Sequence, residues 1–135
     1  MMSDNEIAMF NDSLDRCRKN PRFLDRFYEY FVGSSEAVAA KFAQTDFLRQ
    51  KIMLISSLAA IRSFATRREA THPELDHIAE IHSRTRKDVP AELYTLWLES
   101  LMRAVRECDP CFDLPTEAAW RTVLGLGIAY MTTRY

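Results

Sequence analysis

The chain has 135 residues, of which 47% are hydrophobic and 27% are charged, and its formal net charge is -1 at pH 7. This length and composition suit a single globular domain, residues 1–135, large enough to bury a core. The balanced charge gives no electrostatic reason to expect binding to nucleic acid or to an anionic membrane, and no apolar run approaches the roughly 20 residues of a membrane-spanning helix.

The cysteines, glycines and prolines indicate the compartment and the fold class. Three cysteines are an odd number, which fits a reducing compartment better than a secreted disulfide framework. The acidic start Met-Met-Ser-Asp-Asn-Glu lacks the pattern of a signal peptide, so we expect a cytoplasmic protein. Only three glycines occur, and the prolines at positions 21, 73, 90, 110 and 115 punctuate helix starts, which predicts an all-α fold.

Three helices are expected in the first third of the chain. Apolar residues at spacings of three and four predict an amphipathic helix over residues 5–19. Asn20 and Pro21 have the residue types of an N-cap and a first helical position, so a second helix is expected from there to about Val32. The Gly-Ser-Ser-Glu stretch that follows is expected to cap a short helix that ends at Phe42.

The longest apolar stretch predicts a helix over residues 47–64. Residues 52–61 are apolar nearly all round, so this helix is expected to run through the centre of the fold. Gln50 shares a face of the helix with Leu54, where a polar amide is either a hydrogen-bonded core residue or a group that receives a ligand. The charged residues 62–71 are expected to form a surface connection.

A histidine continues the apolar stripe of the next expected helix, which starts at residues 71–74. Leu75, Ile78 and His82 follow a spacing of i, i+3 and i+7, so the imidazole lies on the apolar face. There it either hydrogen-bonds a carbonyl in the core or binds a metal through one ring nitrogen, and a haem iron is one such metal. His77 lies about 140° round the helix and is expected to face solvent.

Two further helices are expected after His82, the first opened by Pro90 and the last by Pro115-Thr116-Glu117 with Thr116 as its cap. Between them lies the turn Cys108-Asp-Pro-Cys111, which has the spacing of a redox pair or of half a zinc site. No helix N-terminal pattern follows Cys108 to lower its pKa, so loop thiols without a role are the favoured interpretation. Six or seven helices are therefore predicted.

An ordered set of residues resembles a globin over about residues 10–130. The set comprises Arg26-Phe27-Tyr28, Phe31, the stretch that ends at Phe42, Gln50, Leu54, His82, Pro90-Ala-Glu-Leu-Tyr94 and Ala119-Trp120. The order and spacing of Tyr28, Phe42, Gln50, Leu54 and His82 are similar to those of the bacterial haemoglobins related to flavohaemoglobin globin domains. The resemblance implies a globin-like fold of six to seven helices around a haem pocket, with haem b (iron protoporphyrin IX) as the cofactor.

The resemblance also implies a role for each matching residue. His82 is the expected proximal iron ligand, and Tyr28 and Gln50 are the expected distal pair, whose neutral O–H and N–H groups donate hydrogen bonds to a bound gas. The expected haem contacts are Phe42, Leu54, Ile78, Val89, Tyr94, Trp97 and Leu101. Cations at Arg84, Arg86 or Lys87 are a weaker expectation for the haem propionates, because they also suit the negative C-terminal end of the helix.

Departures from the family pattern bear on the activity. The chain stops at Tyr135, soon after the globin region, so we expect any reductive cycle to need an external reductase. Flavohaemoglobins pair the proximal histidine with a late glutamate, whereas no acidic residue follows Glu117 here. The stretch from His82 to Pro90 looks slightly longer than in those relatives, which leaves the role of Val89 open.

Three functions follow from the resemblance. The first is reversible binding of dioxygen or another diatomic gas (NO or CO) at a pentacoordinate haem iron, for oxygen transport or sensing. The second is an enzyme, a nitric-oxide dioxygenase or pseudo-peroxidase supplied by an external reductase. The third is a haem-free globin-like sensor or adaptor in which His82 and Gln50 are core polar residues. The oligomeric state, monomer or homodimer, stays open.

Overall fold

The computed structural model describes residues 4–67, 72–83 and 89–134, and these residues form seven helices and no strand. The helices are α1 (Asp4–Arg18), α2 (Phe23–Val32), α3 (Glu36–Lys41), α4 (Phe47–Arg67), α5 (Pro73–Ile81), α6 (Ala91–Cys108) and α7 (Leu114–Thr132). The prediction of an all-α fold is confirmed. None of the helices in the described part of the chain is long and apolar enough to cross a membrane.

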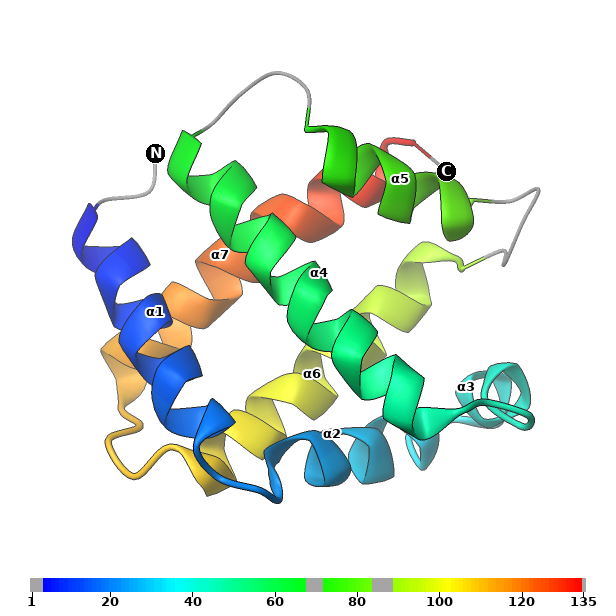
Figure 1. The fold of residues 1–135 in the computed structure, drawn as a ribbon, viewed down its shortest axis with the longest axis horizontal. Helices are drawn as coiled ribbons and strands as arrows, with labels where there is room; N and C mark the ends of the chain where they lie inside the picture. Colours follow the sequence, from blue (N-terminus) through cyan, green and yellow to red (C-terminus); the bar gives the residue numbers. More distant parts are fainter. Residues whose placement is uncertain (1–3, 68–71, 84–88, 135) are drawn as a thin grey trace.

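The helices pack in pairs that are distant in sequence. α1 packs against α7 and α2 against α6, whereas α5 packs against both α4 and α7. Figure 1 shows α4 crossing the front of the molecule, with α6 and α7 behind it. In this view α5 and α2 lie on opposite sides of α4.

The start of α2 differs from the sequence prediction, whereas α3 starts after the predicted cap. α2 begins at Phe23 instead of Pro21, because the side-chain oxygen of Asn20 accepts a hydrogen bond from the backbone N–H of Arg22 (2.9 Å). That bond holds the segment in a turn before the helix. α3 follows the N-cap Ser35, whose hydroxyl accepts from a backbone N–H of the first turn at 3.1 Å.

The caps of α5 and α7 are acceptors that lie just outside each helix. His72 Nδ1 accepts from the backbone N–H of Leu75 (3.3 Å), with a proline at the first helical position. At α7, the carboxylate of Asp113 accepts from the N–H of Thr116 (2.9 Å). The predicted cap Thr116 is therefore wrong, because Thr116 lies inside the first turn as the donor.

α4 runs along the surface and not through the centre of the fold, which corrects the prediction. Leu54, Leu58 and Ile61 face inward. On the other side of the helix, Leu48 and Ile52 are 73% and 64% exposed. An apolar helix is buried all round only if other elements cover every face. α4 also continues to Arg67, so part of the predicted connection is helical, and residues 68–71 lie outside the described residues.

α4 and α7 approach each other closely at Gly127. A Cβ atom at this position would lie 2.8 Å from the Cγ1 atom of Ile61, closer than real side chains tolerate. The missing side chain thus allows α7 to reach the inner face of α4. This contact brings the C-terminal half of α7 toward the space between α4 and α5.

The corner where α1, α6 and α7 meet is closed by a buried polar network. The Trp120 indole N–H donates to the Ser13 hydroxyl (2.8 Å), which donates to the Asp109 carboxylate (2.6 Å). Arg16 binds both oxygens of Asp109 at 2.5 and 3.0 Å, and the Cys111 backbone N–H also donates to it (2.8 Å). We call these five residues the Asp109 network; its hydrogen bonds compensate the burial of the carboxylate, whose side chain is fully buried.

The three thiols surround this network. Cys17 and Cys108 are buried and Cys111 is exposed, and burial raises the pKa of Cys17 to about 12. Within the described ranges, no group of three or more His, Cys, Asp or Glu side chains could hold a metal ion. Within the Cys-x-x-Cys turn, Asp109 makes the long-range contacts, which are its hydrogen bonds with Ser13 and Arg16.

Candidate ligand-binding pocket

A cavity of about 300 Å³ is lined by residues of α2, α3, α4, α5, α6 and the end of α7, and of the segments that join them. Its volume is in the range of small-molecule pockets, and its lining is mostly aliphatic and aromatic. The residues expected from the sequence that line it are Tyr28, Phe42, Gln50, Leu54, Ile78, His82, Val89, Tyr94 and Trp97. Leu101 is fully buried in the core and is not among the lining residues.

His82 is the C-cap residue of α5, one position beyond the helix. Its Nδ1 atom lies 2.7 Å from the backbone carbonyl oxygen of Ile78. Because a carbonyl only accepts, Nδ1 carries the hydrogen and Nε2 carries the lone pair. This is the tautomer that a metal-binding imidazole requires, and the bond to Ile78 also fixes the orientation of the ring.

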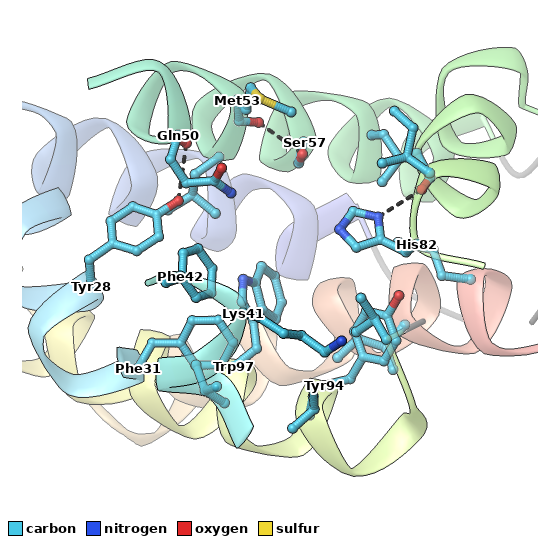
Figure 2. A pocket seen from close by; sticks show the side chains of 18 of the residues that line it. Tyr28, Phe31, Lys41, Phe42, Gln50, Met53, Ser57, His82, Tyr94 and Trp97 are labelled. Carbon is cyan, nitrogen blue, oxygen red and sulfur yellow. Dashed lines mark hydrogen bonds between the residues drawn. The ribbon is translucent and has the colours of Figure 1, made fainter. Parts of the chain in front are cut away.

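Tyr28 and Gln50 lie at the other end of the cavity from His82, as Figure 2 shows. The Tyr28 hydroxyl donates to the backbone carbonyl of Gln50 at 3.0 Å. Burial raises the pKa of Tyr28 well above its ordinary value, so the phenol stays protonated at physiological pH. The Gln50 side-chain amide lines the cavity, and no hydrogen bond joins it to another described residue.

Aromatic rings form the side of the cavity near Tyr28. The ring of Phe42 stacks on that of Phe47, with centroids 6.0 Å apart and planes at 17°, and it meets the edges of Tyr28 and Phe31 at 6.0 and 5.6 Å. At the other end, burial raises the pKa of Tyr94 to about 12, and the ring of this residue lies 6.5 Å from that of His82. The cavity is therefore lined by neutral groups over most of its surface.

Several lining residues were not expected from the sequence. On α4 they are Met53, Ser57 and Ile61, which lie three, seven and eleven residues after Gln50 and so share its helix face. This periodicity could have identified them. The others are Phe31, Val38, Lys41, Thr45, Ile81, Leu93, Ile128 and Met131, and nothing in the sequence distinguishes most of them from core residues. The propionate candidates Arg84, Arg86 and Lys87 lie outside the described residues.

The chemistry of the pocket fits a haem. It offers an imidazole with a lone pair on Nε2 from one side, neutral hydrogen-bond donors from the other, and apolar walls between them. A metal ion that takes four ligands from a macrocycle needs only one or two from the protein, which matches this set. The bound ring would also fill an apolar space that the side chains leave open.

The comparisons with known proteins identify the class of the fold. Neither a scan against protein-family models nor a search of curated proteins finds a match. Among solved structures, the chain is similar to protein PA3967 of Pseudomonas aeruginosa PAO1, whose crystal structure is described as structurally highly homologous to a human hemoglobin. The two chains are 37% identical with a TM-score of 0.91, over 96% of this chain and 98% of that one.

These findings define a hemoglobin-like helical fold around a pocket with a histidine on one side. The chain belongs to the globin family, and the resemblance to a bacterial globin seen in the sequence is confirmed. A hemoglobin-like fold implies a haem cofactor.

Proposed function

We propose that this globin holds haem b in the cavity and reversibly binds dioxygen or another diatomic gas, with His82 as the proximal ligand. The observation that supports this most directly is the 2.7 Å bond between His82 Nδ1 and the Ile78 carbonyl. That bond leaves the lone pair on Nε2, the atom that would ligate iron. The haem supplies an iron with an open coordination position for the gas.

On the distal side, Gln50 is the first hydrogen-bond donor that we assign. Its amide N–H₂ lines the cavity, whereas the Tyr28 O–H is already engaged by the Gln50 carbonyl. Tyr28 can donate to a gas only by giving up that bond, so we assign it as the second donor. Both groups are neutral around pH 7, so the distal hydrogen bonds persist over a wide pH range.

The proximal side favours gas binding over peroxidase-type chemistry. The group that accepts from His82 Nδ1 is a neutral carbonyl, which makes the imidazole less electron-rich than a carboxylate partner would. The acidic residues of α7 end at Glu117, close to its N-terminus and far along the helix from Met131, which lines the cavity. We therefore place reversible binding ahead of catalysis driven by an external reductase.

An absorption spectrum of the purified, haem-supplemented protein tests the proposal. We expect a strong Soret band that shifts on reduction with dithionite and shifts again when carbon monoxide is added. The first shift reports a redox-active haem and the second an accessible coordination position. The absence of a Soret band under haem-replete conditions would contradict the proposal and return His82 to the role of a core histidine.

A further inference from the structure

α5 must hold His82 at the right distance from the metal, although it is a helix of only nine residues. Two of its side chains, Leu75 and Ala79, are buried, and they pack on the α4 and α7 side. Directional contacts are therefore needed to fix its position along and around its axis. The structure provides them at the N-terminal end of α5, through a tyrosine of α7.

The hydroxyl of Tyr130 makes two hydrogen bonds to the start of α5. It accepts from the backbone N–H of His72, the N-cap residue, at 3.0 Å. It donates to the carboxylate of Asp76, one turn further along the helix. A single oxygen atom thus ties both the backbone and a side chain of α5 to α7.

The ring of Tyr130 is itself held on both sides. The Arg134 guanidinium lies 3.6 Å from the ring centroid, and its Nε atom binds the Asp76 carboxylate at 3.1 Å. The ring of Phe64, from the last turns of α4, meets the Tyr130 ring at 4.9 Å in an edge arrangement. Tyr130 is 7% exposed, and its hydrogen bond from the His72 backbone is buried.

We infer that Tyr130, together with Asp76 and Arg134, positions His82 for the haem iron by fixing the place of α5 in the fold. The inference rests on the proposed function. His82 follows the last residue of α5 and lies six positions after Asp76, about 9 Å at the rise of a helix, and a helix transmits a displacement of one end to the other. Tyr130 does not line the cavity, so it acts as a positioning residue and not as a haem contact.

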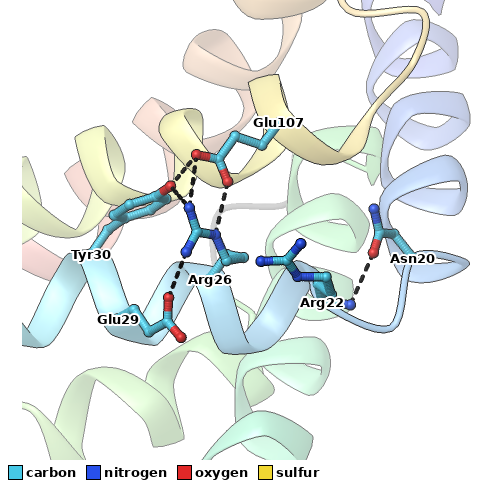
Figure 3. Close-up of polar contacts among 6 residues, drawn as sticks. All are labelled: Asn20, Arg22, Arg26, Glu29, Tyr30 and Glu107. Atoms are coloured by element: carbon cyan, nitrogen blue, oxygen red, sulfur yellow. Dashed lines mark hydrogen bonds and ion pairs between the residues drawn. The ribbon is translucent and has the colours of Figure 1, made fainter.

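A second cluster, in which a tyrosine hydroxyl also donates to a carboxylate and an arginine also lies over the ring, offers a control. Tyr30 of α2 donates to the Glu107 carboxylate of α6, and the guanidinium of Arg103 lies 3.9 Å from its ring centroid. Figure 3 shows Tyr30 and Glu107 of this cluster together with Arg26, which also binds Glu107 at 3.0 Å. It joins α2 to α6 without touching α5, so removing its hydroxyl loses a similar bond without moving His82.

The experiment compares the Tyr130→Phe and Tyr30→Phe proteins loaded with haem. We expect Tyr130→Phe to shift and broaden the iron–histidine stretching band in resonance Raman spectra of the ferrous, gas-free protein. It should also speed haem loss about fivefold, less than the full worth of the two hydrogen bonds that are removed, because only the part that displaces His82 acts on the haem. Tyr30→Phe should leave both measurements at the wild-type value.

Two further measurements keep the test decisive. Amide hydrogen exchange of the haem-free protein should become faster in α5 for Tyr130→Phe but not for Tyr30→Phe. If Tyr130→Phe folds poorly, Asp76→Asn replaces it, because the Asp76 side chain is 44% exposed and an amide keeps an acceptor for the tyrosine. We expect its effect on the iron–histidine band to be smaller than that of Tyr130→Phe.

The outcomes separate this inference from the proposed function. If α5 exchanges faster but the iron–histidine band and haem loss match those of Tyr30→Phe, the inference is overturned and haem binding stands. If the wild-type protein shows no haem band at all, the proposed function fails and the positioning role fails with it. Faster exchange in α5 together with a shifted band supports the inference.

Discussion

Two regions of this globin are built in opposite ways, although α6 and α7 run through both. At the corner where α1, α6 and α7 meet, the space is filled by Phe10 and Trp120, whose ring centroids are 4.6 Å apart, and by the Asp109 network. At the pocket end, the same two helices contribute Trp97 and Met131 to a cavity of about 300 Å³. One end of the helix pair is packed by the chain, and the other leaves room for a ligand.

The contrast shows where stability and function are located. The corner makes its contacts whether or not a ligand is present, because they join residues of α1, α7 and the turn after α6, none of which lines the pocket. In the pocket, each apolar side chain that faces the cavity lacks van der Waals contacts on that side. These side chains gain such contacts when a ligand fills the cavity, so ligand binding stabilises the fold. Substitutions at the corner should therefore act on folding, and substitutions at the pocket on ligand binding.

The largest effect is expected from His82→Ala, which should abolish stabilisation by haem. A ligand at about 1,000-fold its Kd stabilises the native state by about 4 kcal/mol, and this contribution disappears if the proximal ligand is removed. The measurement is the shift in Tm on adding haem to each protein. His77→Ala, at an exposed position of the same helix, is the control and should keep the full shift. A normal shift for His82→Ala would show that another residue ligates the iron.

At the opposite corner, Asp109→Ala should cost about 3 kcal/mol in the free energy of unfolding. The substitution leaves Arg16 without its bidentate partner and removes the acceptor of Ser13; breaking a buried ion pair costs about 3–5 kcal/mol, and we expect the lower end because the Arg16 side chain is 30% exposed. Urea unfolding with and without haem measures it, and the loss should be the same in both conditions. Asp113→Ala, an exposed helix cap two residues beyond the turn, should cost only about 1 kcal/mol. A loss that depends on haem would contradict the separation of the two regions.

The pKa of the Asp109 carboxylate predicts how the free energy of unfolding depends on pH. Burial opposes ionisation of Asp109, but hydrogen bonds from Arg16, Ser13 and the Cys111 backbone outweigh it and lower its pKa below the ordinary value. A group with a depressed folded-state pKa stabilises fully above its unfolded pKa, about 3.9 for Asp, and loses that contribution as the pH falls through the folded value. The stability difference between wild type and Asp109→Ala should thus be constant at neutral pH and shrink below about pH 4. A difference that stays constant down to pH 3 would contradict this assignment.

The sequence predicted the pocket better than it predicted the corner, for a physical reason. Gln50 and Leu54 share a face of α4 and His82 follows the last turn of α5, positions that the 3.6-residue period indicates, and the resemblance to globins implies that they form one pocket. The Asp109 network joins Ser13 to a residue 96 positions away, and no local pattern reports such a contact. The Cys-x-x-Cys spacing is visible in the sequence, whereas the long-range role of Asp109 between the two cysteines is not.

The exposure of α4 could not be predicted for a related reason. Ile52 lies in a run that is apolar on every side, but burial depends on whether another helix covers that side. The hydrogen-bond acceptor of the Tyr28 hydroxyl likewise cannot be predicted from the sequence. The resemblance to bacterial globins implies that Tyr28 and Gln50 lie close together, whereas only the structure shows that the acceptor is the backbone carbonyl and not the side chain.

The smallest expected effects are changes in the dioxygen off-rate on substitution of the distal pair, Gln50 and Tyr28. Gln50→Leu should raise the dioxygen off-rate by roughly tenfold, since it removes one neutral hydrogen bond to the gas. Tyr28→Phe should change the off-rate by less than about twofold, because its O–H donates to the Gln50 carbonyl at 3.0 Å. Flash photolysis or stopped-flow mixing of the ferrous protein measures both rates. If Tyr28→Phe raised the off-rate as much as Gln50→Leu, the hydroxyl must leave the carbonyl when the gas binds, and Tyr28 would rank equal to Gln50 as a donor.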